Sequence, residues 1–252
     1  MEETEKELIK AGADAAMKPF ANLLEKLFGG AVEEIGGMWQ DAWKVRRFER
    51  QIKLFERLQS KIESSGVPPH PIPDKFWLPS VEAASREDDP TLQDKWASLL
   101  ANAAITDETF LPAYPEILRQ ITPIEVQILD GMYQHARRNL KVDVEITNSH
   151  PPRLVKPDKW AKVISMNVSL NEVFEAELKE LRAEKSRFDA LIAFERSIRV
   201  SVENLKRLGL VGIYSLEIAQ DRMAPGFPFL RFEMLGLCFV HASTTPENRI
   251  MG

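Results

Sequence analysis

Cysteine is nearly absent from this sequence, since Cys238 stands alone among 252 residues. A single cysteine excludes a disulfide within the chain and a zinc site built from several thiolates. Because it lies in an apolar stretch, we expect a buried and unreactive thiol. The histidines are widely separated and form no His-x-x-x-His pair, so we predict no metal site and expect no other cofactor. One of them, His70, lies in a proline-rich linker, where we expect it to be exposed.

Long apolar runs are also missing. The most apolar windows, residues 23–39 and 227–240, contain charges or prolines and fall short of the ~20 residues that a membrane-spanning helix needs. The acidic start, Met1-Glu-Glu-Thr-Glu-Lys-Glu, lacks the basic and apolar parts of a secretion signal. A formal net charge of −5 argues against a globally basic nucleic-acid binder. We therefore expect a cytoplasmic protein, with peripheral contact at the inner face of the membrane as the alternative.

What is present is typical of a folded helical chain, with 44% hydrophobic and 28% charged residues. We predict a mainly α fold: an N-terminal and central helical bundle with a C-terminal winged-helix-like α/β unit. The predicted segments are 1–65 (a helical region with glycine-rich hinges and a long charged helix), 66–138 (a central helical domain built on Trp77, Trp96 and Ile128), 139–169 (an insertion with a short strand near residues 142–146) and 170–252 (the winged-helix-like unit).

Two glycine pairs, Gly29-Gly30 and Gly36-Gly37, interrupt an amphipathic N-terminal segment. Glycine in a helix interior costs ~1 kcal/mol relative to alanine, so we interpret the pairs as hinges or as points of close helix–helix approach. The polar side of the segment carries glutamates, which anionic lipids disfavour. Self-association is therefore favoured over contact with a membrane surface. The candidate interaction residues in this segment are Phe28, Trp39 and Trp43.

A long helix is predicted from Trp39 to Glu63. Its apolar residues recur at steps of three or four, close to the spacing of a coiled-coil seam; they are Val45, Phe48, Ile52, Phe55, Leu58 and Ile62. Leu54 lies beside this seam and widens it. Its alternating basic and acidic residues are more typical of a solvated face with i,i+4 pairs than of a nucleic-acid surface. Such a helix can pair with a second copy of itself, so we expect a homo-oligomer.

Residues 73–104 read as two helices joined by an acidic elbow. Asp89 is a good N-cap because its side chain can accept a hydrogen bond from the first helical turn, and Pro90 suits the first helical position. The acidic run from Glu87 to Asp89 also lies at the positive end of the helix dipole. One face of the second helix is apolar at helical spacing, and its members are Leu92, Trp96, Leu99, Leu100 and Ala103.

Residues 78–102, Leu-Pro-Ser-Val-Glu-Ala-Ala-Ser-Arg-Glu-Asp-Asp-Pro-Thr-Leu-Gln-Asp-Lys-Trp-Ala-Ser-Leu-Leu-Ala-Asn, resemble the signature of the abortive infection alpha (Abi-alpha) family. Two flanking stretches, 31–36 and 112–129, are similar to the family in the same order. The resemblance implies a role in bacterial defence against phage. It implies no known reaction and no catalytic residue. The residues of this motif and its core are Trp77, Glu87, Asp88, Leu92, Trp96, Leu99, Leu100 and Asn102.

Further elements can be predicted downstream. A short helix opens near Pro115, and Thr122-Pro-Ile-Glu is a complete capping box for the helix that follows. The predicted buried face of that helix is Ile124, Ile128, Leu129, Met132 and Tyr133. Polar helix formers run from residue 170 to 187, and a helix from Ser197 is stopped by Gly209. Residues 210–218 and 227–233 then read as a β-hairpin, followed by a last short helix or strand.

A winged helix invites a DNA-binding interpretation, because basic residues lie along its recognition helix and in its wing. Acidic residues share the same surfaces, which handicaps phosphate binding. Winged helices also recognise proteins, and we favour that interpretation, with a DNA-binding regulator as the alternative. The candidate interaction residues here are Arg199, Lys206 and Arg207, beside Arg196 and, in the wing, Arg222; the acidic neighbours are Glu195, Glu203, Glu217 and Asp221.

No set of side chains for catalysis is evident in the sequence, and we predict a protein that is not an enzyme. The acidic run from Glu87 to Asp89 is the weak alternative, as part of a metal-dependent nuclease, but helix capping explains most of it. We expect a phage-defence protein that acts through protein–protein or membrane contact, with an unknown protein or phage trigger as partner. On this hypothesis, removing residues 1–38 abolishes protection and leaves a folded remainder.

Overall fold

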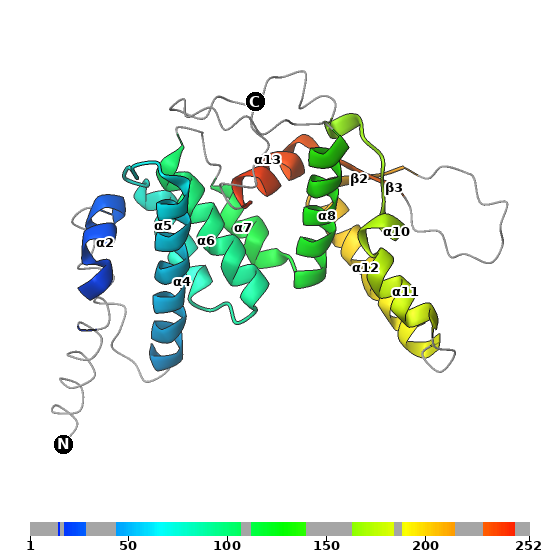
Figure 1. Ribbon diagram of the computed structural model, residues 1–252, viewed down its shortest axis with the longest axis horizontal. Coiled ribbons are helices and arrows are strands. Elements are labelled where there is room, and N and C mark those ends of the chain that lie inside the picture. Colours follow the sequence, from blue (N-terminus) through cyan, green and yellow to red (C-terminus); the bar gives the residue numbers. More distant parts are fainter. Residues whose placement is uncertain are drawn as a thin grey trace. The chain divides into compact units, whose positions relative to one another are not determined.

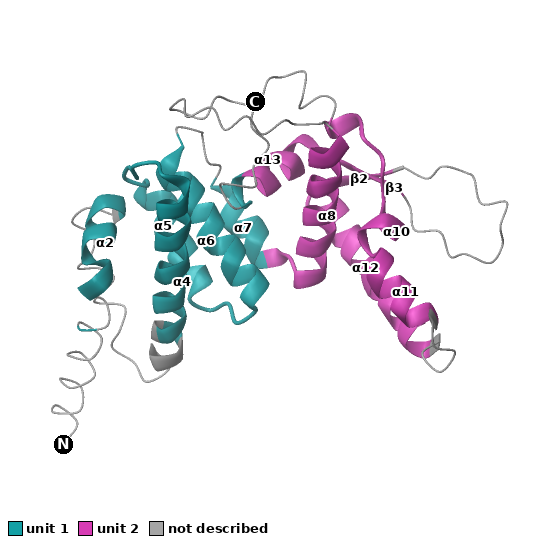
Figure 2. Ribbon diagram, viewed as in Figure 1, with its two compact units in different colours: residues 1–119, 242–249 teal, residues 120–241, 250–252 magenta. Residues whose placement is uncertain are grey.

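The computed structural model describes residues 15, 18–28, 44–106, 112–139, 163–183, 188–214 and 229–244. As predicted, these residues are mainly helical, with a small antiparallel sheet near the C-terminus. The chain divides into two compact units: residues 1–119 with 242–249, and residues 120–241 with 250–252 (Figure 2). The two glycine pairs and the strand predicted near residues 142–146 lie outside the described residues.

Unit 1 is helical throughout its described part (Figure 1). Its elements are η1 (Lys18–Phe20), α2 (Ala21–Phe28), α4 (Lys44–Ser65), α5 (Asp74–Ala84), α6 (Pro90–Ile105) and α7 (Ala113–Gln120), whose last residue falls in unit 2. The most extensive packing is between α4 and α6, which lie side by side. The short helix predicted near Pro115 is confirmed as α7.

The apolar seam predicted for α4 is used within the chain. Phe55, Leu58 and Ile62 are buried, and Leu54 joins them as predicted. The Phe55 ring lies 6.3 Å from the ring of Phe20 between centroids, so η1 covers part of the seam. Each such buried side chain contributes about 1.5–3 kcal/mol to folding. The described part of this face therefore forms core within unit 1.

Helix α2 is anchored through its buried side. Leu24 and Leu27 are buried, and the amide of Ile72 donates to the carbonyl oxygen of Leu27 at 2.9 Å. The linker that supplies Ile72 also holds His70, which was expected to be exposed. That expectation is wrong: His70 is half-buried, and its Nε2 lies 3.0 Å from the carbonyl oxygen of Thr106. The linker is thus tied to α2 and to the end of α6.

Unit 2 combines helices with the sheet (Figure 1). Its elements are α8 (Pro123–Asn139), β1 (Val168–Ser169), α10 (Leu170–Val173), α11 (Glu175–Ala183), α12 (Phe188–Arg207), β2 (Val211–Tyr214), β3 (Phe229–Phe232) and α13 (Met234–Ala242), whose last residue falls in unit 1. The strand order is β1-β3-β2, and both pairings are antiparallel. Leu230 of β3 is paired with Val168 on one side and with Ile213 on the other. The segment after residue 234 is a helix.

The start of α8 follows its capping-box sequence. The Glu125 carboxylate reaches back to accept from the amide of Thr122 at 2.5 Å, which satisfies a donor that the helix itself leaves unpaired. The predicted buried face is confirmed for Ile128, Leu129, Met132 and Tyr133, while Ile124 is half-buried. Gly131 on this helix lies close to Val173: a Cβ there would come within 2.5 Å of Val173 Cγ1. The glycine therefore lets α10 approach α8.

The helices before and at α12 differ from the sequence prediction. The helix predicted from residue 170 to 187 is divided into α10 and α11 at Phe174, which is fully buried. Helix α12 begins at Phe188 rather than at Ser197. The rings of Phe174 and Phe194 pack edge to face with centroids 5.5 Å apart. This long-range contact needs both the break at Phe174 and the longer α12, and neither has a local sequence signal.

The C-terminal end of α12 follows the prediction. Gly209 adopts a positive φ of 70°, which residues with a Cβ adopt at a cost. Its amide donates to the carbonyl oxygen of Lys206 and the next amide, of Leu210, donates to that of Leu205, each at 2.9 Å. These two hydrogen bonds are those of a Schellman motif. Gly209 thus ends α12 and directs the chain into β2.

Candidate functional site

The acidic elbow between α5 and α6 is built by its own backbone. Asp89 is the N-cap of α6, and its carboxylate accepts from the amides of Thr91 and Leu92 at 2.8 and 3.1 Å. Glu87 Oε1 accepts from the amides of Asp88 and Asp89 at 3.0 Å each. Two of the three carboxylates therefore serve as acceptors for amides that a helix start leaves unpaired. The N-cap predicted at Asp89 is confirmed.

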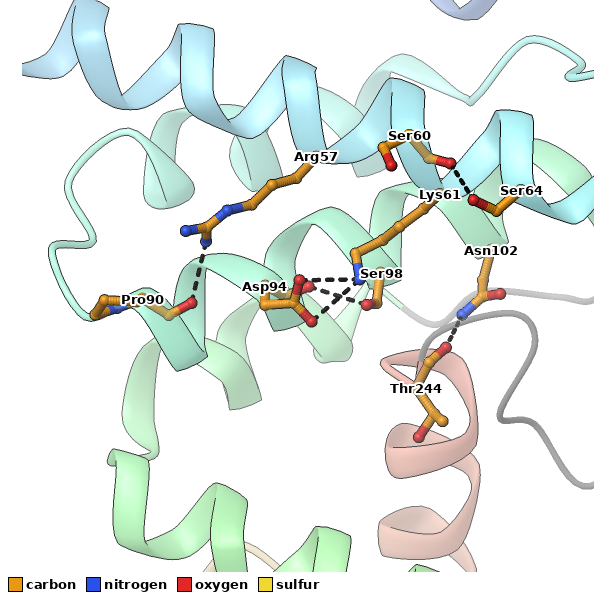
Figure 3. A network of polar contacts seen from close by, with 9 residues as sticks. All are labelled: Arg57, Ser60, Lys61, Ser64, Pro90, Asp94, Ser98, Asn102 and Thr244. Carbon is orange, nitrogen blue, oxygen red and sulfur yellow. Dashed lines mark hydrogen bonds and ion pairs between the residues drawn. The ribbon is translucent and has the colours of Figure 1, made fainter.

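Basic side chains of α4 hold this elbow from the other side. Arg50 Nη1 donates to the carbonyl oxygen of Arg86 at 3.0 Å, and its Nη2 lies 3.8 Å from Asp88 Oδ2. Arg57 Nη1 donates to the carbonyl oxygen of Pro90 at 3.0 Å. Figure 3 shows Arg57 extended from α4 toward the first turn of α6. The charges of α4 that we interpreted as a solvated face thus include two arginines that fix the elbow.

The ion pair of Lys61 with Asp94 completes this contact. Lys61 Nζ lies 2.9 Å from Asp94 Oδ1 (Figure 3), and only 12% of the Lys61 side chain is exposed. By contrast, 83% of the Asp88 side chain is exposed. Exposed ion pairs contribute at most about 1 kcal/mol, and screening by solvent weakens them. We therefore expect the Lys61 pair to stabilise the packing of α4 on α6 more than the Arg50 pair does.

The apolar residues of the motif form the core of unit 1, as their spacing predicted. Those predicted from the sequence, Trp77, Leu92, Trp96, Leu99 and Leu100, are all buried. Trp77 Nε1 donates to Asp74 Oδ1 at 3.1 Å. Trp96 Nε1 is buried and has no hydrogen-bond partner among the described residues. Such an unpaired donor is costly, so packing of the indole ring must compensate for it.

Asn102, the last residue of the motif, binds a distant segment of unit 1. Its Nδ2 donates to the carbonyl oxygens of Ala242 and Thr244, each at 2.7 Å, and the side chain is fully buried. Figure 3 shows the contact with Thr244. Ala242 ends α13, and the last carbonyl groups of a helix have no partner within it. Asn102 thus satisfies acceptors at the end of α13, a role that its place in the sequence gave no sign of.

A second polar network joins the start of α8 to the end of α12 within unit 2. Asn204 Nδ2 donates to Glu125 Oε1 at 2.8 Å and to the carbonyl oxygen of Gln120 at 3.2 Å. Arg207 Nη2 donates to Asn204 Oδ1 at 2.8 Å and to Gln120 Oε1 at 3.3 Å. Glu125 is buried, with 2% of its surface exposed. Arg207, a candidate DNA contact, is therefore bound within its own unit.

The other basic candidates on α12 are freer. Lys206 is exposed, and its Nζ lies 3.9 Å from Glu203 Oε2. Arg199 is exposed, and no described residue forms an ion pair or hydrogen bond with it. Of the three basic residues predicted to contact a partner, the structure leaves Arg199 the most available. The wing residue Arg222 and its neighbours lie outside the described residues.

Of the N-terminal candidate residues, only Phe28 belongs to a described helix. Phe28 ends α2, while Trp39 and Trp43 are outside the described residues. No helix in the described ranges is long and apolar enough to cross a membrane. What the structure adds is that α2 and α4, the helices before and after this stretch, both pack into unit 1.

A buried polar contact of unit 2 was missed from the sequence. The Tyr133 hydroxyl lies 2.7 Å from His241 Nδ1, and both side chains are buried. They are 108 residues apart, so no local spacing connects them. Tyr133 was predicted on the buried face of its helix, and it is a core residue. Cys238, expected to be buried, is only partly so.

In the described ranges, no group of three or more His, Cys, Asp or Glu side chains is arranged so that it could hold a metal ion. Within unit 2, His135 Nδ1 lies 3.2 Å from Glu172 Oε2. The motif therefore contributes core packing, helix capping and interhelix hydrogen bonds. Among the candidate residues that the structure describes, those that stay exposed are Asp88 in the elbow and Arg199, Lys206 and Arg207 on α12.

A family model described as abortive infection alpha matches residues 46–224. The matched range contains most of α4, the elbow, all of α6 and most of unit 2. No match was found among curated proteins or among solved structures. The resemblance first noted in residues 78–102 is thereby confirmed over most of the chain.

Proposed function

Because the chain belongs to the abortive infection alpha family, we propose that it protects bacteria against phage by abortive infection, in which the infected cell is halted or killed. The observation that carries the proposal is the family match over residues 46–224. This range includes the complete elbow and the Trp-Ala-x-Leu-Leu-Ala-Asn sequence of α6. The fold of unit 1 depends on that sequence, as the burial of Trp96 and Asn102 indicates.

We propose further that the protein acts without catalysis, through contact with other proteins or with a membrane surface. The use of the motif supports this. Glu87 and Asp89 accept hydrogen bonds from backbone amides, and Asn102 is fully buried. Polar residues engaged in this way stabilise the fold and are poorly placed to bind a substrate.

The effector in this proposal is the segment that joins α2 to α4, with Phe28, Trp39 and Trp43 as its contact residues. Self-association is the favoured mode, because anionic lipids disfavour the glutamates of this segment. The described seam of α4 is already covered within unit 1 by Phe20 and α6, so in this proposal the segment makes the contact and the seam does not. Removing residues 1–38 is not a clean test, since it also removes Phe20, Leu24 and Leu27 from the core. Substitution of Trp39 and Trp43 leaves that core in place.

Unit 2 is the sensor in this proposal, and we interpret it as a winged helix. Its elements follow the order helix (α8), strand (β1), three helices (α10, α11 and α12), hairpin (β2 and β3) and a last helix (α13), with β1 beside β3 at the edge of the sheet. In this arrangement α12 takes the place of the recognition helix. Fold alone does not choose between a protein and DNA as the ligand. The mixed charge of α12 favours a protein.

The test is protection of bacteria that express the chain. Phage should form fewer plaques on cells that produce the native protein than on cells with an empty vector. Infected cultures of the producing cells should stop growing before phage is released. The variant with Trp39→Ala and Trp43→Ala should lose protection at an unchanged protein level, and light scattering of the purified protein should show loss of the oligomer. A variant with Lys53→Ala, on the exposed side of α4, is the matched control. Absence of protection by the native chain would refute the proposal.

A DNA-binding regulator is the second candidate, favoured by the unpaired, exposed Arg199 on α12. It predicts binding to duplex DNA with a steep dependence on salt, because Lys and Arg release counterions from phosphates. Replacing Arg199 and Lys206 by alanine should then flatten the salt dependence. Absence of duplex binding at low salt would eliminate this candidate.

A further inference from the structure

One side of α12 presents apolar and charged residues together. We call it the α12 face and define it by Ile192, Arg196, Arg199, Val200 and Glu203, all of which are exposed. Ile192, Arg196, Val200 and Glu203 follow one another at steps of four, four and three, and Arg199 lies four residues before Glu203. This spacing places all five on one side of the helix. The buried residues Ile198, Val202 and Leu205 lie on the opposite side and pack into unit 2.

The apolar members of the α12 face are unusually exposed. Val200 is 65% exposed and Ile192 is 42% exposed. In the described part of the chain, the large hydrophobic residues with such exposure are these two and Met234. Single exposed apolar residues need no explanation, but two that are two turns apart on one helix form a stripe that a partner helix can cover.

The charges of the α12 face are available for a partner. Arg196 and Arg199 flank Val200 along this side, and neither is paired with another described residue. Glu203 is 3.9 Å from Lys206, and both side chains are more than half exposed, so that pair is weak. With two arginines and one glutamate, the face carries a formal charge of +1 around an apolar centre.

A second copy of the chain fits this face poorly. Antiparallel pairing that lays Ile192 on Val200 also sets Arg196 against Arg196 and Asp189 against Glu203. Parallel pairing opposes each arginine with itself. Like charges directly opposed are destabilising. DNA is also disfavoured, since Glu203 repels phosphate and Val200 offers nothing to it. The complementary partner has apolar residues at helical spacing with carboxylates beside them.

We propose that the α12 face binds an acidic amphipathic helix of another protein, whose apolar side chains cover Ile192 and Val200 and whose carboxylates pair with Arg196 and Arg199. This inference rests on the proposed role of unit 2 as a sensor of a protein partner. Arginine binds carboxylates through two parallel N–H···O hydrogen bonds, which gives the contact geometric specificity. The apolar stripe supplies the area that is removed from water.

The probe is a library of random peptides of about 20 residues, long enough to form a helix. Peptides are selected on the purified full-length chain, and their affinities are measured by fluorescence anisotropy. We expect the selected peptides to combine Asp or Glu with apolar residues at spacings of three and four. Val200→Glu should lower the affinity of the selected peptides about tenfold or more, and the double variant Arg196→Glu with Arg199→Glu should do the same. Lys53→Glu on α4 of unit 1 changes the charge by two units, more than Val200→Glu and half as much as the double arginine variant, and should leave affinity unchanged.

Three results would overturn the inference: no enrichment of peptides over an unrelated protein, selected peptides without acidic residues, or equal binding by the Val200→Glu variant with an unchanged circular dichroism spectrum. The peptide assay uses purified protein, so it is independent of phage protection. A chain that selects such peptides but does not protect cells refutes the proposed function alone. If the native chain protects cells but selects no peptides, and the Val200→Glu variant also protects cells, then only the inference about the α12 face is refuted.

Discussion

The Asn102 amide donates to the carbonyl oxygen of Thr244 at 2.7 Å, although 142 residues separate the two. The same nitrogen donates to Ala242, so one buried side chain satisfies two acceptors, one on the last residue of α13 and one just after it. An asparagine suits this site because its amide carries two donor hydrogens. The last residue of the family motif therefore joins the middle of the sequence to its C-terminal part within unit 1.

Asn102→Ala should lower stability by about 2 kcal/mol, because two buried carbonyl groups lose their donors. Asn102→Asp should lower it further, since a carboxylate would face the same oxygens. Thermal unfolding followed by circular dichroism measures both. Asn139→Ala is the control: Asn139 is exposed and donates to His135 in its own helix, so its loss should change stability by no more than about 0.5 kcal/mol. An aspartate variant as stable as the native chain would contradict this account.

Local signals in the sequence predicted much of the fold, and the contacts between distant residues were not predictable. The start of α8 at Thr122 and the helix stop at Gly209 each depend on a few neighbouring residues. The structure contains the Glu125 hydrogen bond of the predicted capping box and the positive φ of Gly209. The partners of Asn102 and the pairing of Tyr133 with His241 depend on tertiary packing across more than 100 residues. Helix propensity carries no information about such pairs.

The candidate site shows the same division. The buried face of α6 follows from its spacing, and Asp89 follows from the chemistry of helix starts. The hydrogen bonds of Arg50 and Arg57 to the carbonyl groups of Arg86 and Pro90 were not predictable, because an alternating charge pattern is the same on a solvated face. Exposure of Val200 was also hidden, since a valine in a helical pattern is more often buried.

Trp96 should tolerate a change to phenylalanine better than a change to alanine. Trp96→Ala leaves a large cavity in the core and should cost about 3–5 kcal/mol, with loss of function through unfolding. Trp96→Phe keeps most of the ring packing and removes a buried donor that has no partner among the described residues. Urea unfolding should place this variant much closer to the native protein. Equal losses for the two variants would show that the indole nitrogen has an unrecognised partner.

The effect of Gly131→Ala on stability should change sign when the neighbouring Val173 is replaced. In the native chain the new Cβ would approach Val173 Cγ1 to 2.5 Å, and the stiff valine side chain cannot yield easily, so a loss of about 1–2 kcal/mol is expected. With Val173→Ala the clash is removed, and the same change should gain up to about 1 kcal/mol from helix propensity. A double-mutant cycle by thermal unfolding measures both. The same loss in both backgrounds would place the strain elsewhere.

Asp88→Ala separates the structural use of the elbow from a catalytic one. The Asp88 side chain is 83% exposed, and its pair with Arg50 spans 3.8 Å, so its removal should leave stability within about 0.5 kcal/mol of native. If the protein acts without catalysis, this variant should protect cells fully, and the purified chain should not cleave DNA or RNA with magnesium. Asp89→Ala is the comparison, because loss of its N-cap hydrogen bonds should cost about 1 kcal/mol while protection persists at permissive temperature. A folded Asp88→Ala protein without protection, together with magnesium-dependent cleavage by the native chain, would establish the acidic elbow as part of a nuclease site.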